Sequence, residues 1–239
     1  MQKPRVFIFY GPNGAGKGTQ GEKIAEPLRA AGALVDVIDS WGDLIQPRVY
    51  PAGTDQDWTF RFTLHTQPGI FTRTRSGERE INKAGEFNSP DWVSWLACRV
   101  IRERLVDGIV PIMTGTSRTP LEGREVAAEI AMQHEAGIAG GAVVIGLLID
   151  IETAKQRIRD RMPTLPPAQQ EKEQYKIDKM DRRFEWYFND TLPGIAELKR
   201  SLTASTTPLT AIDITDDGTM TPQEIHEKIW KELQAHKLV

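Results

Sequence analysis

The first residues able to do chemistry lie in a glycine-rich stretch near the start of the chain. Glycines let successive backbone N–H groups point inward around a phosphate, and a helix beginning behind them adds the positive end of its dipole. Lys17 would reach the β- and γ-phosphates of a nucleotide as a mobile charge. The residues predicted to bind phosphate are Gly11, Pro12, Asn13, Gly14, Ala15, Gly16, Lys17, Gly18 and Thr19.

The residues on either side of this loop predict the strand and the helix that a phosphate-binding loop requires. Val6 to Tyr10 is an apolar run typical of a buried parallel strand. Behind the loop, the apolar residues from Ile24 to Leu28 share one face of a predicted helix. The strict signature has Ser or Thr directly after the lysine, whereas here Gly18 follows Lys17 and Thr19 comes one place later.

The run Gly-Pro-Asn-Gly-Ala-Gly-Lys-Gly-Thr-Gln closely resembles the loop of adenylate kinases and related nucleoside monophosphate kinases. The resemblance touches most of the chain from Val6 to Leu233, with a specific motif only in the loop. It implies a three-layer α/β P-loop sandwich with a five-stranded parallel sheet in the order 2-3-1-4-5. It also implies ATP as the phosphoryl donor and Mg²⁺ as the cofactor, with Thr19 beside the metal ion.

Phosphoryl transfer needs positive charge around the transferred group, so the arginines are the next candidates. Arg157 and Arg161 match the Arg-x-x-x-Arg that precedes the lid in adenylate kinases, where such residues contact the donor base and its phosphates. Arg183 begins the run Arg-Phe-Glu-Trp-Tyr-Phe-Asn-Asp-Thr-Leu-Pro, which resembles a further arginine motif of that family. With Lys17, these arginines are the predicted catalytic residues on the donor side.

The acceptor side departs from the family. Where adenylate kinases have Asp-Gly-Phe-Pro-Arg-Thr after the third strand, this chain has Thr-Gly-Thr-Ser-Arg-Thr at 114–119. Arg118 is retained as the candidate catalytic clamp on an acceptor phosphate, whereas Thr114 replaces the aspartate that helps to hold magnesium. In adenylate kinases a glutamine recognises the acceptor adenine, and Glu122 lies at or near that position here. Trp41 stands where the same family has a threonine. We therefore expect an acceptor other than AMP bound in the adenylate kinase manner.

A hydroxyl acceptor would instead need a nearby carboxylate as a base. Asp39 and Asp43 follow a predicted second strand at 34–38 and could supply it. A helix cap, or hydrogen bonds to the ligands of a magnesium ion, would explain these two residues equally well. Trp41 offers a flat face that could stack on a base or belong to the core. The predicted acceptor-binding residues are Ser40, Trp41, Asp43 and Arg118.

An insertion over residues 40–90 is predicted to contain a β-hairpin at about residues 59–75, because alternating residues flank the turn at Pro68-Gly69. Its arginines, interleaved with Phe60, Phe62 and Phe71, could bind a bulky anionic acceptor or, as a less favoured partner, a nucleic-acid strand. Arginines on the wet face of a hairpin are the more common case. A short lid is expected at about residues 162–180.

The elements that must position these residues alternate along the chain. Further strands are predicted at 109–113, 142–149 and 209–214, with helices between them, which indicates a parallel sheet covered on both faces. The net charge of −3 argues against wholesale coating of nucleic acid. One cysteine excludes an intrachain disulfide framework, and no leader or membrane span is recognised, so we expect a cytoplasmic enzyme.

The sequence thus predicts one P-loop kinase domain over residues 1–239 that moves the γ-phosphoryl group of Mg-ATP to a nucleotide-type acceptor. Two alternatives stay open. One is a kinase that phosphorylates a hydroxyl of a nucleoside, a small metabolite or a modified base in DNA, with Asp39 or Asp43 as the base. The other is a nucleotide-binding regulatory protein without catalysis, suggested by Thr114 in place of aspartate. The sequence does not define an oligomeric state.

Overall fold

The computed structural model describes residues 3–38, 59–83 and 88–239. Within them, five strands form one sheet in the spatial order β2-β5-β1-β6-β7, and every neighbouring pair is parallel. Numbered along the chain within this sheet, the order is 2-3-1-4-5, so the predicted fold class is confirmed. The strands are β1 (Val6–Tyr10), β2 (Val35–Ile38), β5 (Val110–Met113), β6 (Ala142–Leu148) and β7 (Leu209–Thr215).

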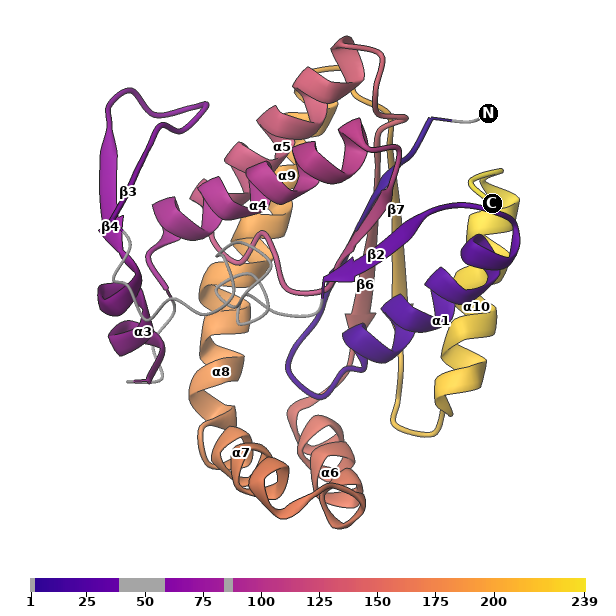
Figure 1. The fold of residues 1–239 in the computed structure, drawn as a ribbon. Coiled ribbons are helices and arrows are strands. Elements are labelled where there is room, and N and C mark those ends of the chain that lie inside the picture. The colour runs from indigo at the N-terminus through magenta and orange to yellow at the C-terminus, as the bar shows by residue number, and fades with distance from the viewer. Residues whose placement is uncertain (1–2, 39–58, 84–87) are drawn as a thin grey trace.

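Helices cover both faces of the sheet (Figure 1). α1 (Lys17–Ala30) and α10 (Pro222–Ala235) lie on one face, and α4 (Pro90–Val106), α5 (Pro120–Glu135) and α9 (Leu192–Ala204) lie on the other. Successive side chains of a strand point to opposite faces. Val6 and Ile8 of β1 accordingly join the apolar cluster beneath α4, α5 and α9, whereas Phe7 and Phe9 join the one beneath α1 and α10. The all-apolar composition of β1 therefore follows from its central position.

A helical arm leaves the sheet after β6. It consists of α6 (Ile151–Arg161), a 3₁₀ turn (Met162–Thr164), α7 (Pro167–Asp178) and α8 (Met180–Trp186), and a π-helical turn (Tyr187–Thr191) joins it to α9. Figure 1 shows the arm at the end of the molecule to which the β6 arrow points. The helical path from α7 to α8 is interrupted at Lys179, whose φ and ψ of −102° and 9° are not helical. We call residues 151–186 the α6–α8 arm.

The arm has a small apolar cluster of its own. Ala154 and Ile158 of α6 are buried against Met180 and Phe184 of α8. These residues form a cluster separate from the two that line the sheet. The arm therefore has an apolar contact of its own between α6 and α8.

The predicted hairpin is present as the antiparallel pair β3 (Thr59–Phe62) and β4 (Phe71–Thr74), followed by α3 (Arg75–Lys83). Its aromatic rings pack on the core, with Phe62 buried and Phe60 and Phe71 partly buried. Phe62 is 5% exposed and stacks on Trp95 of α4, with 5.0 Å between ring centroids, and Phe60 also packs against Trp95. Burial of the Phe62 ring leaves only the partly buried rings of Phe60 and Phe71 for stacking, and binding of a nucleic-acid strand stays the less favoured prediction.

No helix in the described part of the chain is long and apolar enough to cross a membrane.

Candidate active site

The glycine-rich loop joins the end of β1 to the start of α1 and has a backbone that only glycine adopts readily. Gly11, Gly14 and Gly16 have φ of 145°, 87° and 88°. A Cβ at Gly11 would lie 2.4 Å from the carbonyl oxygen of Leu147, and one at Gly14 would lie 2.7 Å from that of Ala154. Side chains are thus excluded at both positions by β6 and α6, which hold the loop backbone in place.

Lys17 is the first residue of α1, and its side chain folds back over the loop. Its Nζ donates hydrogen bonds to the carbonyl oxygens of Gly11 and Pro12, at 2.8 and 2.9 Å. The ammonium group therefore lies over the loop, where a bound phosphate could exchange with these backbone contacts. Thr19 is exposed in the first turn of α1, and its hydroxyl oxygen is a ligand type that Mg²⁺ accepts.

The loop after β5 lies beside the glycine-rich loop. Ile8 of β1 is paired in register with Met113 of β5, so the segments after both strands leave the same edge of the sheet. The chain continues from β1 toward β2 on one side and from β5 toward β6 on the other, which makes this the topological switch point where α/β sheets bind ligands. Thr114 is 2% exposed, and its hydroxyl lies 3.2 Å from the carbonyl oxygen of Ile38.

Arg118 lies at the end of this loop, next to a buried carboxyl group. The N–H group of Arg118 donates to Glu122 Oε2 at 3.0 Å, and the N–H group of Glu122 donates to Thr119 Oγ1 at 3.3 Å. Thr119 therefore caps α5, while the carboxylate accepts from the backbone of Arg118. Glu122 is 3% exposed, and burial raises its pKa to about 7 despite the opposing effect of the Arg118 N–H group.

The arginines predicted for the donor side are all on the α6–α8 arm. Arg157 on α6 pairs with Asp216 and donates to the carbonyl oxygen of Met220 at 3.1 Å, which ties α6 to the segment after β7. Arg161 is exposed at the end of α6, and Arg183 is partly buried on α8. The predicted residues Asp39, Ser40, Trp41 and Asp43 lie outside the described residues.

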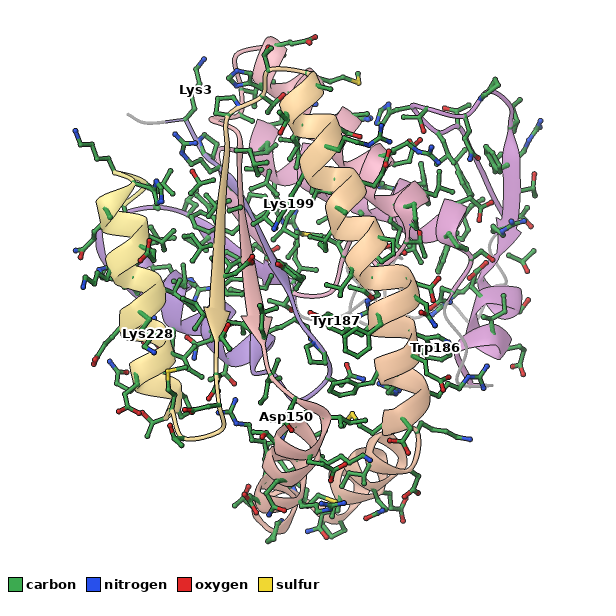
Figure 2. The ribbon with its side chains drawn as sticks, turned by 180° about the vertical axis from the view of Figure 1, so that it is seen from behind. Lys3, Asp150, Trp186, Tyr187, Lys199 and Lys228 are labelled. Carbon is green, nitrogen blue, oxygen red and sulfur yellow. The ribbon has the colours of Figure 1, made fainter. Side chains whose placement is uncertain are left out.

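A polar cluster that sequence reasoning missed lies directly before the glycine-rich loop. Tyr10 donates to Asp213 Oδ1 at 2.6 Å, and Lys199 Nζ lies 5.0 Å from the centre of the Tyr10 ring. Burial, followed by the bond to Asp213, raises the pKa of Tyr10, and burial raises that of Tyr187 to about 12. Figure 2 shows Lys199 and Tyr187 pointing toward the strands. The only sequence signal was an aspartate inside an otherwise largely apolar strand.

Buried carboxylates of α5 anchor the hairpin. Glu125 accepts from the N–H groups of His65 and Thr66 at 2.6 and 2.8 Å, and Glu129 contacts His65 Nε2 at 2.8 Å. Burial would raise the pKa of Glu129, but hydrogen bonds from His65, Arg102 and Gln133 outweigh it and lower the pKa to about 2. Neither glutamate had been singled out, because helical periodicity does not distinguish buried charges from exposed ones.

The sulfur of Cys98 lies near this anchor, within 4.8 Å of ligand atoms of His65 and Glu129. The three groups could in principle coordinate a metal ion. Both oxygens of Glu129, however, already accept hydrogen bonds, from Arg102 at 3.0 Å, Gln133 at 2.7 Å and His65 at 2.8 Å. The guanidinium group also supplies the positive charge that the carboxylate needs, so the arrangement fits an anchor better than a metal centre.

On the other side of the hairpin, Arg73 forms an ion pair, although its side chain is 39% exposed. Its Nη2 lies 2.7 Å from Asp91 Oδ2 at the start of α4. Glu78 of α3 is 1% exposed and accepts from Asn88 Nδ2 and the N–H group of Ser89, at 3.1 and 3.0 Å. These contacts fix the hairpin and α3 to α4.

Comparisons with known proteins give no family. No family model and no curated protein matches the chain. Among solved structures, that of APE1195 shares 18% identity at a TM-score of 0.47, covering 98% of this chain and 97% of that one. A shikimate kinase from Acinetobacter baumannii in complex with shikimate shares 17% identity at a TM-score of 0.45, with 99% and 96% coverage.

Proposed function

We propose that this chain is an ATP-dependent phosphotransferase that moves the γ-phosphoryl group of Mg-ATP to a nucleotide-type acceptor. The observation that carries the proposal is the loop from Gly11 to Thr19. It combines three glycines of positive φ, a helix starting at its end and a lysine ammonium lying over its backbone. Such an arrangement presents N–H groups and a charge to phosphate oxygens.

The roles of the residues follow from where charge develops. Backbone N–H groups of the loop would hold the β-phosphate, and Lys17 would exchange its carbonyl partners for phosphate oxygens. Arg161 and Arg183 belong to the arm that borders the same end of the sheet and would approach the transferred group when the arm closes. Mg²⁺, when bound beside Thr19, neutralises phosphate charge. Arg118 would hold the acceptor.

The first test is the substitution Lys17→Ala. We expect the variant to remain folded and to lose turnover by about two to three orders of magnitude, because transition-state charge loses a preorganised partner. ADP formation is measured with and without candidate acceptors, which comprise nucleoside monophosphates, nucleosides and short DNA strands. The matched control is Lys23→Ala, in the same helix, whose ammonium bonds Gln223 at 2.9 Å instead of the loop.

The same assay separates the competing functions. Transfer to a monophosphate supports the proposal, and transfer to nucleosides or DNA alone supports a hydroxyl kinase with a base at Asp39 or Asp43. ATP binding without ADP formation argues against all of these acceptors and leaves a regulatory protein or a kinase of a small metabolite. Equal turnover in the wild type and in folded Lys17→Ala protein would show that the loop takes no part in catalysis.

A further inference from the structure

Two hydroxyl groups in the loop after β5 are buried and have no hydrogen-bond partner among the described residues. Thr116 is 2% exposed and Ser117 is fully buried, and within residues 3–38, 59–83 and 88–239 neither Oγ1 of Thr116 nor Oγ of Ser117 has a partner. A buried polar group without a partner costs roughly 1–3 kcal/mol, so an orphaned hydroxyl in a native protein calls for an explanation. Two in succession, at the topological switch point, point to a ligand.

The backbone at the same place is held in an unusual conformation. Ser117 has a φ of 59°, in the left-handed region that non-glycine residues seldom adopt. The carbonyl oxygen of Ser117 packs on Gly194 of α9, where an added Cβ would lie only 2.4 Å away. The contact with α9 therefore holds the loop in a conformation that non-glycine residues seldom adopt, and such strain is found most often at functional sites and switch regions.

The chemistry of the loop defines what it would bind. Thr116 and Ser117 can donate hydrogen bonds, Arg118 supplies a positive charge, and the N-terminus of α5 follows with its positive dipole end. Glu122 is the one carboxyl group of this segment and already accepts from the Arg118 backbone. Because its pKa is raised to about 7 by burial, much of the population holds it uncharged at neutral pH, which reduces its repulsion of an anion.

We propose that Thr116 and Ser117 are specificity-determining residues that bind the phosphate group of a nucleoside monophosphate acceptor beside Arg118. The inference rests on the proposed function and names the acceptor class for the same site. The adenylate kinase pattern has Phe-Pro at these two positions, so the family resemblance does not imply a hydroxyl group at either of them. Since neither is exposed, binding includes a small movement of the loop, for which the strained Ser117 is suited.

The test measures ligand-induced shifts in Tm, which need no catalysis. The variants are Thr116→Val, Ser117→Ala and their combination. The control is Ser94→Ala, whose hydroxyl is also fully buried but donates to the carbonyl oxygen of Pro90 at 2.6 Å. The probes are ATP, the four monophosphates AMP, GMP, CMP and UMP, and their nucleosides. Removing an orphaned hydroxyl should raise the Tm of the free protein by a few degrees, whereas Ser94→Ala should lower it.

At least one monophosphate, and not its nucleoside, should raise the Tm of the wild type and of Ser94→Ala. That shift should fall at least twofold in each hydroxyl variant and disappear in the double variant, while the ATP shift persists. Equal monophosphate shifts in all variants, no shift by any monophosphate, or a lower Tm of free Ser117→Ala would each overturn the inference. If ATP does not change the Tm of the wild type, the proposed function is overturned instead.

Discussion

At the scale of single residues, Glu122 is a buried carboxyl group whose pKa lies near neutral pH. Burial raises its pKa from 4.5 to about 7, so the folded state holds the proton more tightly than the unfolded chain does. The proton therefore stabilises the fold below the unfolded pKa. This contribution is lost as pH rises from 4.5 through about 7, because the unfolded state then gives up its proton more readily.

We accordingly expect Glu122→Gln to stabilise the protein at pH 8 by on the order of 2 kcal/mol relative to wild type, and to change stability little at pH 4.5. The amide can still accept from the Arg118 N–H group, so the bond is kept and the charge is removed. Urea unfolding at the two pH values measures the difference. Glu135→Gln, exposed at the end of the same helix, is the control, and an equal change at both pH values would contradict the argument.

At the scale of elements, the close approach of α5 and α9 determines how the arm connects to the acceptor loop. A Cβ at Gly123 of α5 would lie 2.2 Å from the carbonyl oxygen of Gly194 of α9. Gly194 in turn lies against the backbone of Ser117 and Thr119. Two glycines thus let the backbones of α5, α9 and the loop touch, and a shift of α9 is transmitted directly to Ser117.

The substitution Gly123→Ala should therefore destabilise the fold, although alanine is the better helix former. The added methyl group meets backbone that cannot move without separating the helices, and we expect a cost of about 2–4 kcal/mol. Thermal unfolding gives the measurement. Met132→Ala, on the exposed side of the same helix, should change the Tm little. A Gly123→Ala protein as stable as wild type would mean that the two helices are free to separate.

At the scale of the whole molecule, the local sequence patterns predicted the framework better than the contacts between distant elements. The strands followed from apolar runs, whereas their order followed from the family resemblance that the glycine-rich loop carries. The alternation of Phe60 and Phe62 identified a strand, but a period of two cannot tell which partner covers the buried face. Arg157 pairs with Asp216, and Glu125 is buried by residues far from it in the chain. No local sequence pattern could predict either contact.

The arm should also behave as a separate unit in solution. Its apolar cluster is separate from the two that line the sheet, and besides its two chain connections it is held by the contacts of Arg157 with Asp216 and Met220. We expect backbone amides of residues 162–178 to exchange faster than those of α5 in the free protein and to slow severalfold when ATP and an acceptor are added. Hydrogen exchange measures both. An exchange rate in this segment that neither ligand changes would argue against closure of the arm.

Cys98 gives the folded chain one further property. It is the only cysteine in the sequence, it lies in the packed centre of α4 at 4% exposure, and burial raises the pKa of its thiol. A reagent that attacks thiolates therefore finds no target until α4 leaves its neighbours. The rate of alkylation therefore measures how often α4 separates from its neighbours, and it does not report movement of the arm.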